Sequence, residues 1–227
     1  MHLHLQTKER EPYLRYTEVV NFEHPEVSKR ARLLRESCHS TLALAQKTFT
    51  YVRDNIHHSS DLAAKHMTQG AAYTLSDEMA ARLPAEFVAK PMPCTASEVL
   101  LAGEGICLTK AHLLAALLRH NGIPAGFCYQ RLRLYDQMDA PLIFHGFNAL
   151  FLPQLGRWLR VDARGNKPGV DAQFSLETER LAFKVSPSLA EEDFGIVYAD
   201  PPAGILRAFK TWPTYGQFWR HLPSELE

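Results

Sequence analysis

The hydrophobic pattern changes from a helical to an extended period about half-way along the chain. From about Pro25, apolar residues recur every three or four positions, which predicts helices. After Pro124 they alternate with other residues, which predicts strands. Helices are expected from about Pro25 to Ile56 with a break near Ser37–Ser40, at about 95–103 behind the capping box Thr95–Glu98, and at about 107–120, and strands at 126–134, 142–152 and 157–163.

The rest of the chain has weaker patterns. The N-terminal arm, residues 1–24, looks extended and predicts a strand or hairpin arm at the edge of the domain. Residues 62–93 predict short helices and loops, and a strand is expected near Phe194–Tyr198. The tail 201–227 is helical around 205–209 and aromatic beyond, so we expect it to pack on the domain rather than form a separate module.

Size and composition predict a single soluble domain over residues 1–227. Apolar residues make up 46% and charged residues 22% of the chain, and 25 Lys and Arg balance 25 Asp and Glu. The zero net charge predicts neither a nucleic-acid partner nor a membrane surface. No run reaches roughly 18 apolar residues, and the first ten residues lack the apolar core of a signal peptide. A cytoplasmic protein with reduced thiols is therefore expected.

Cys107 is the cysteine whose surroundings predict chemistry. A glycine-rich turn, Gly103–Ile106, delivers it to the first position of the helix expected at 107–120. The unpaired N–H groups and positive dipole end of a helix N-terminus stabilise a thiolate, which is the nucleophilic form. The other cysteines lie in no metal-binding or Cys-x-x-Cys pattern and are expected to be small buried residues: Cys38, Cys94 and Cys128.

A hairpin predicted around the turn Pro153–Gly156 would give this cysteine a base and an orienting acid. If Leu152 pairs with Arg157, His145 lies opposite Arg164 with Asp162 as its diagonal neighbour. If the register shifts by one residue on each strand, His145 lies directly opposite Asp162. Both registers put the imidazole and the carboxylate on one face, within roughly 4.5–8 Å. A Cys107–His145–Asp162 triad is the resulting hypothesis.

These motifs together resemble the transglutaminase-like superfamily. The resemblance rests on Thr95–Leu100, Gly105–Cys107 and Gly122–Ala125, followed by the His145 strand and the Trp158–Asp162 strand in the expected order. It covers roughly residues 40–165. It implies an α+β, papain-like transglutaminase-core fold, in which N-terminal helices and the cysteine helix pack on an antiparallel sheet. It also implies Cys107 as nucleophile, His145 as general base and acid, and Asp162 as orienter.

The chain departs from the superfamily pattern near the candidate site. Gly146, Phe147 and Asn148 follow the histidine where an aromatic and an acidic residue are common, and Lys110 replaces a common acidic residue. The Cys107 N–H is the natural first oxyanion donor. The second donor is left open among His57, His58 and Trp158, with His58 preferred. The remaining oxyanion or cleft candidates are Asn148, Arg164 and Asn166.

The chemistry expected is acyl transfer or hydrolysis on an amide through a thioester, without metal or cofactor. The substrate would be a peptide, a protein or a small amide, and peptidase or amidase activity is expected at least as much as cross-linking. Alternatives are an inactive transglutaminase-like binding module and an acetyltransferase with the same triad. A metal site of His57, His58 and His66 is disfavoured, because adjacent residues on a helix diverge by about 100°.

Overall fold

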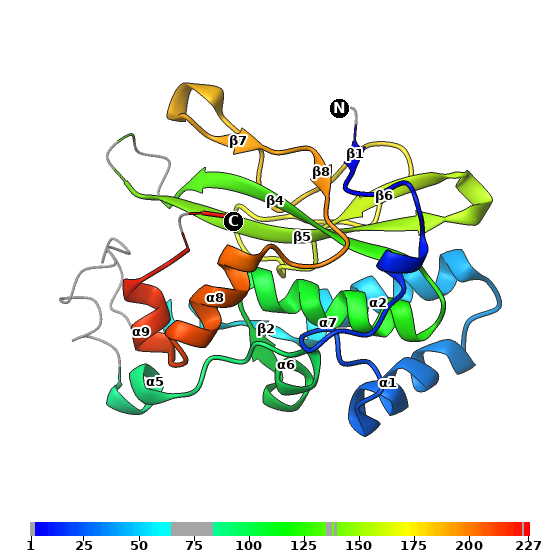
Figure 1. The fold of residues 1–227 in the computed structure, drawn as a ribbon, viewed down its shortest axis with the longest axis horizontal. Coiled ribbons are helices and arrows are strands. Elements are labelled where there is room, and N and C mark those ends of the chain that lie inside the picture. The colour runs from blue at the N-terminus through cyan, green and yellow to red at the C-terminus, as the bar shows by residue number, and fades with distance from the viewer. Residues whose placement is uncertain (1–2, 65–83, 135–137, 139, 224) are drawn as a thin grey trace.

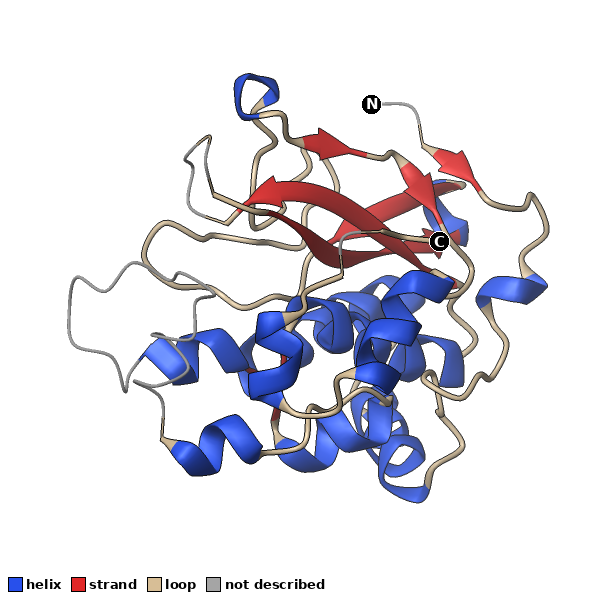
Figure 2. Cartoon of the chain, turned by 60° about the vertical axis from the view of Figure 1, so that its left-hand side comes forward, coloured by secondary structure: helices blue, strands red, loops and turns tan. Residues whose placement is uncertain are grey.

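The computed structural model describes residues 3–64, 84–134, 138, 140–223 and 225–227. A layer of helices lies against one face of a curled antiparallel sheet, as Figures 1 and 2 show from two sides. The predicted α+β arrangement, with N-terminal helices and the cysteine helix packed on an antiparallel sheet, is confirmed. The helices are α1 Pro25–Glu36, α2 Thr41–Asn55, α3 Ser59–Ala64, α5 Ala85–Ala89, α6 Ala96–Ala102, α7 Cys107–His120, α8 Ala203–Thr211 and α9 Tyr215–Arg220.

The main sheet has the strand order β6-β5-β4-β7. Leu152 pairs with Arg157 across the β5–β6 hairpin, so the first of the two predicted registers is the one adopted. Two further pairs, β1 with β8 and β2 with β3, are parallel and short. The strands are β1 His4–Leu5, β2 His57–His58, β3 Glu104–Gly105, β4 Ala125–Arg133, β5 Leu142–Leu152, β6 Arg157–Val161, β7 Glu192–Asp193 and β8 Ile196–Val197.

Helix α7 is the central element of the helical layer. Its apolar positions recur at helical spacing, but it lies between the sheet and helices α1, α2 and α6, so almost its whole circumference is buried. The expectation of one apolar face was therefore too narrow. Lys110, His112 and Arg119 are buried with the leucines and alanines. Polar groups in such a place need partners, and backbone carbonyl oxygens accept hydrogen bonds from all three side chains.

The N-terminal arm differs from the extended arm that was expected. It forms only the two-residue strand β1, which pairs with β8, and then a 3₁₀ turn over Glu11–Tyr13. The reason is that the side chain of Tyr13 holds the arm, in addition to the backbone pairing of β1 with β8. Tyr13 is fully buried, and its hydroxyl donates to the carbonyl oxygens of Val197 at 3.1 Å and Thr7 at 3.2 Å. The strand expected near Phe194–Tyr198 is reduced to β8.

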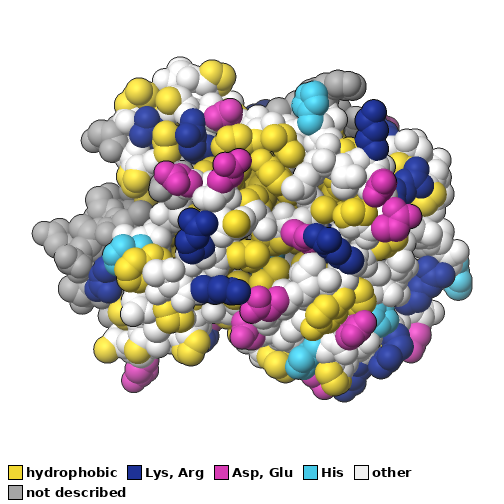
Figure 3. Space-filling view, in the orientation of Figure 1, with side chains coloured by type: hydrophobic (Ala, Val, Ile, Leu, Met, Phe, Trp, Pro, Cys, Tyr) yellow, Lys and Arg dark blue, Asp and Glu magenta, His cyan; other side chains and the backbone are white. Residues whose placement is uncertain are grey.

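The C-terminal tail packs on the helical layer beside the start of α7 (Figure 1). The rings of Phe209 on α8 and Phe218 on α9 stack with their centroids 4.5 Å apart. Most of the segment expected at 62–93 lies outside the described residues. Figure 3 shows hydrophobic side chains gathered in the middle of one face, with both charge signs around them. Among the described residues, no helix is both long enough and apolar enough to cross a bilayer.

Candidate active site

The start of α7 is fixed by the short parallel pair β2–β3. His58 lies opposite Gly105 in this pair, two residues before Cys107. A Cβ atom on Gly105 would lie 2.6 Å from Thr109 Oγ1, so only glycine allows the strand to turn this tightly into the helix. Local backbone geometry therefore places His58 beside the first residue of α7.

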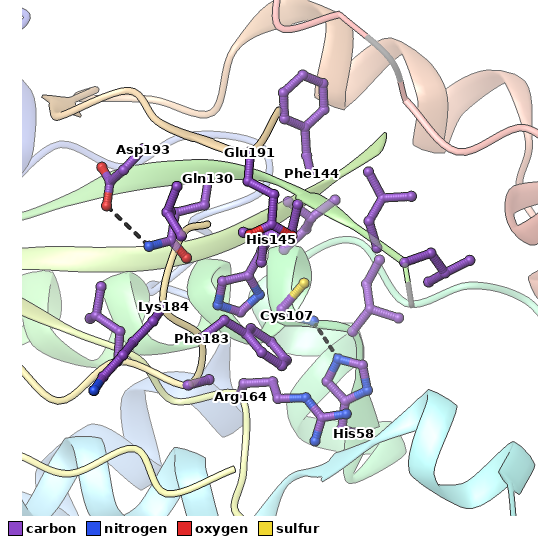
Figure 4. A pocket seen from close by; sticks show the side chains of 18 of the residues that line it. His58, Cys107, Gln130, Phe144, His145, Arg164, Phe183, Lys184, Glu191 and Asp193 are labelled. Carbon is purple, nitrogen blue, oxygen red and sulfur yellow. Dashed lines mark hydrogen bonds between the residues drawn. The ribbon is translucent and has the colours of Figure 1, made fainter. Parts of the chain in front are cut away.

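A second glycine brings α7 onto the sheet. A Cβ atom on Gly146 would lie 2.7 Å from Leu108 Cδ2 and 3.2 Å from Leu108 Cα. Its absence lets the first turn of the helix approach β5 closely, so that Cys107 comes next to His145 (Figure 4). Gly146 looked like a departure from the superfamily pattern, and the close helix–strand contact is the physical reason for it.

The imidazole of His145 is held by Asp162. The two residues lie beyond the last ladder pair, Asn148 with Val161, and His145 Nε2 is 2.7 Å from Asp162 Oδ2. The backbone N–H groups of Ala182, at 2.9 Å, and Arg164, at 3.1 Å, also donate to this carboxylate. Because Nε2 is engaged in this way, Nδ1 is the ring nitrogen left for Cys107.

The electrostatics of these three side chains favour an ion pair. Burial raises the pKa of the Cys107 thiol. The charge and hydrogen bond of His145 and a hydrogen bond with the Gly146 backbone lower it by more than burial raises it, so the pKa lies below its usual value. Burial lowers the pKa of His145, but the charges of Asp162 and Cys107 and their hydrogen bonds raise it to about 10. The pKa of Asp162 falls below its usual value despite burial, because His145 and two N–H groups stabilise its charge. These shifts favour a thiolate beside an imidazolium.

Residues 64–163, which contain all three of these side chains, match the family model described as Transglutaminase-like superfamily. This part of the chain is therefore similar to the transglutaminase-like core. A solved structure from Cytophaga hutchinsonii, named a "putative cysteine protease", is similar with 15% identity and a TM-score of 0.46. The similarity covers 70% of this chain and 43% of that protein, so the chain spans less than half of its length. The comparison with curated proteins found no match.

His58 has a different hydrogen-bonding role from the predicted one. Its Nε2 accepts the backbone N–H of Cys107 at 3.0 Å, and its Nδ1 lies 2.6 Å from Ser60 Oγ. Burial and the positive charges of Arg164 and Lys110 lower its pKa well below the usual value, so the ring is neutral. His58 therefore lies at the candidate oxyanion position, but there it accepts a hydrogen bond instead of donating one.

Arg164 lines the cavity beside Cys107 and His145, but its charge is already paired with a carboxylate. Asp61 accepts from Arg164 Nη1 at 2.6 Å and from Nη2 at 2.8 Å. Lys167 donates to the same carboxylate at 2.8 Å. These ion pairs of Asp61 connect α3 to the loop after β6 and so fix the cavity wall behind His58.

The three remaining cleft candidates lie elsewhere. Trp158 packs its ring against Tyr13 and Phe151 at the other end of the hairpin. Asn148 is fully buried and donates to the carbonyl oxygens of Ala111 and Gly126, so it joins α7 to β4. Asn166 bonds the backbone of Ala172 through both amide atoms and shapes a loop. The expectation that these residues line the cleft is corrected, because none of the three belongs to the lining of the cavity beside Cys107.

A cavity of about 1220 Å³ opens beside Cys107 and His145. One wall is apolar and is built by the free end of the β4–β5 hairpin and by the C-terminal tail: Leu132, Ile143, Phe144, Phe218, Trp219 and Leu222. Two residues beside His145 were not predicted from the sequence. The ring of Phe183 meets that of His145 edge-on with a centroid distance of 4.9 Å, and Gln130 lies opposite His145 on β4. Only the polar member of a predicted strand, Gln130, could have been suspected from the sequence.

The metal site considered from the sequence gains no support from the described residues. No group of three or more His, Cys, Asp or Glu side chains in this part of the chain is arranged to hold an ion. His57 is exposed and pairs with Glu104 between β2 and β3. His66 lies outside the described residues.

Proposed function

We propose that the protein is a cysteine-dependent enzyme that transfers or hydrolyses the acyl group of an amide through a thioester. The proposal rests above all on one observation. Cys107, whose thiol has a lowered pKa, lies beside an imidazole that Asp162 orients, and both open onto one cavity. The transglutaminase-like core supports a cysteine-enzyme fold, and the residues supply the chemistry.

In the proposed acylation, Cys107 Sγ forms a bond with the carbonyl carbon, and the electron pair of the carbonyl moves onto its oxygen. His145 then gives its Nδ1 proton to the leaving nitrogen as the carbon–nitrogen bond breaks. A thioester and a free amine result. Asp162 keeps Nδ1 directed at the reacting atoms by holding Nε2, and it stabilises the imidazolium until the proton is transferred.

Deacylation uses the same groups in reverse. Neutral His145 takes a proton from water or from an incoming amine, which attacks the thioester carbon. The carbon–sulfur bond breaks, and the proton on His145 restores the ion pair. Water gives hydrolysis and an amine gives acyl transfer. We propose a peptide, a protein or a small amide as the acyl donor.

The oxyanion site needs a change at His58 before it can work. The Cys107 N–H is the first donor of the proposed hole, but it bonds to His58 Nε2 in this structure. If the neutral ring changes tautomer by releasing the Nδ1 proton to water and taking one from water on Nε2, the Ser60 hydroxyl donates to Nδ1, and Nε2–H and the Cys107 N–H both become donors to the substrate. Displacement of the ring by substrate would free the Cys107 N–H alone. Either change would let the charged oxygen bind at the helix N-terminus.

A panel of acyl-donor probes, read as mass added at Cys107, tests the proposal. The panel should include esters and amides of N-acetylated amino acids with apolar side chains, because one wall of the cavity is apolar. We expect labelling of the wild type, none in Cys107→Ala, and a rate at least about 100-fold lower in His145→Gln. Cys128→Ser is the matched control, since Cys128 is buried away from the cavity. Labelling that persists in Cys107→Ala would contradict the proposal.

A further inference from the structure

Gln130 is a buried polar residue that faces the base of the proposed reaction. It lies on β4 directly opposite His145 on β5, and opposite Asp193 of β7 on its other side. Only 2% of its surface is exposed, and it lines the cavity. Directly opposite residues in an antiparallel pair project to the same face, so the amide and the imidazole are neighbours.

Neighbouring charges fix the orientation of this amide. Gln130 Nε2 donates to Asp193 Oδ2 at 3.0 Å. That carboxylate is itself held by Arg160 Nη1, which is 2.8 Å from both of its oxygens, and by the N–H of Gly195 at 3.0 Å. A carboxylate accepts hydrogen bonds and donates none. The nitrogen of Gln130 must therefore face Asp193, and its oxygen must point the other way.

The oxygen that remains is an acceptor without a partner. Gln130 Oε1 is buried, and no described residue donates to it. Figure 4 shows it on the side of the amide that is turned toward His145. An unsatisfied buried acceptor costs free energy, and proteins keep few of them. Arg160 and Gly195 hold the carboxylate of Asp193, and Asp193 in turn holds the amide of Gln130. The free oxygen is thereby fixed in place beside a cavity, which is the arrangement of a ligand-binding atom.

We propose that Gln130 Oε1 accepts a hydrogen bond from an N–H on the amine side of the substrate. The inference rests on the proposed function. In that reaction, His145 must reach the departing or incoming nitrogen, so the amine part of the substrate lies over the imidazole. Cys107 and Gln130 flank His145 in Figure 4, which places Gln130 on the side of the amine and away from the acyl group. Gln130 thereby selects amides and amines over esters and alcohols.

Two donors that differ in one group test this assignment. The p-nitroanilide and the p-nitrophenyl ester of N-acetyl-leucine carry the same acyl group, but only the anilide has an N–H at the leaving atom. Gln130→Met removes the acceptor with little change of side-chain length. We expect the acylation rate with the anilide to fall about 10- to 100-fold, and the rate with the ester to stay within about threefold. Melting temperature checks that the variant is folded.

Leu132→Met is the matched control, because Leu132 lies two residues along the same face of β4 and also lines the cavity. It should leave the anilide-to-ester ratio unchanged. An equal loss with both donors in Gln130→Met, or no loss with either, would overturn the assignment and would leave a bound water as the partner of Oε1. A wild type that consumes the ester but not the anilide would overturn it as well. If neither donor labels Cys107 in the wild type, the proposed function itself fails.

Discussion

The two ends of α7 both bury charged side chains, but they satisfy them in different ways. At the C-terminal end, Arg119 is 3% exposed and donates hydrogen bonds to backbone carbonyl oxygens, among them Ala125 at 2.7 Å and Arg15 at 2.9 Å, with the carboxylate of Asp200 farther away at 3.9 Å. At the N-terminal end, Cys107 and His145 are held by each other and by Asp162, which are groups that titrate. One end is closed by core packing, and the other opens onto the cavity.

This difference shows that buried charge alone does not mark an active site. Carbonyl oxygens cannot change their protonation state, and Asp200 lies beyond hydrogen-bond distance, so the hydrogen bonds of Arg119 hold the N-terminal arm and the segment before α8 against the helix. At Cys107 each partner can give or take a proton, and each shifts the pKa of the other. The N-terminal end is therefore expected to carry reactivity and the C-terminal end stability. The predictions that follow test this division.

The largest effect is expected for Asp162→Asn. The charges and hydrogen bonds of Asp162 and Cys107 together raise the pKa of His145 to about 10, so removal of the carboxylate lowers this pKa and shifts the proton from the imidazole toward the Cys107 thiol. We expect acylation of Cys107 to fall about 10³- to 10⁴-fold, as for a triad that loses its orienting charge. Rates of probe labelling at equal temperature measure the effect. A loss below about tenfold in a folded variant would remove Asp162 from the mechanism.

The second test compares thiols within one chain. Burial raises the pKa of Cys94 to about 12, with Glu98 acting in the same direction, whereas the pKa of Cys107 is lowered. Because only the thiolate reacts, iodoacetamide at pH 7 should alkylate Cys107 at least about 100-fold faster than Cys94. Peptide mass mapping over time gives both rates. The rates should converge in urea, and similar slow rates in the folded protein would contradict the ion pair.

The main elements of the fold could be predicted because the signals that define them are local. Ser40, Thr95 and Gly103 cap helices as their residue types predict, and the β5–β6 turn sets the hairpin register. The N-terminal arm could not be predicted in this way. Its conformation depends on Tyr13 reaching the carbonyl oxygen of Val197, 184 residues away, and no local pattern encodes such a contact.

The residues of the candidate site differ in the same way: those with local sequence signals could be predicted, and those that depend on distant contacts could not. Cys107, His145 and Asp162 were found from one helix start and one hairpin, which are both short-range features. Gln130 was missed, because what sets it apart is the carboxylate of Asp193 on a strand 63 residues away. Trp158 was misplaced, because strand alternation gives the face of a residue but not its position along the sheet relative to α7.

A smaller effect is expected at the other end of α7. Arg119→Met leaves several buried carbonyl oxygens without donors, although it also removes a charge that burial disfavours: the pKa of Arg119 is lowered to about 9. We expect the free energy of unfolding to fall by about 2–3 kcal/mol. Urea unfolding measures it, and Arg119→Lys should recover only part of the loss. The labelling rate of Cys107 should stay within about threefold, and a large drop would show that the two ends are coupled.

The smallest effect at neutral pH is expected for Lys110→Met, in the first turn of the helix. Lys110 Nζ donates to the carbonyl oxygens of Arg164, at 2.8 Å, and of Ile56. Burial and the charge of Arg164 lower its pKa to about 7, so near that pH the hydrogen bonds and the cost of the buried charge offset each other. We expect the free energies of unfolding of the two proteins at pH 7 to differ by less than about 1 kcal/mol.

Raising the pH should increase the difference in the free energy of unfolding between the wild type and Lys110→Met. Above pH 7 the folded wild type holds Lys110 neutral, while the unfolded chain keeps the proton up to its ordinary pKa of 10.5. The unfolded state then binds more protons, so this group makes wild-type stability rise with pH. The difference between wild type and Lys110→Met in urea unfolding should therefore grow in favour of the wild type from pH 7 to pH 9. Groups common to both proteins cancel in this difference. A difference that stays constant over this range would mean that Lys110 is charged in the folded core and donates to carbonyl oxygens as a cation, as Arg119 does.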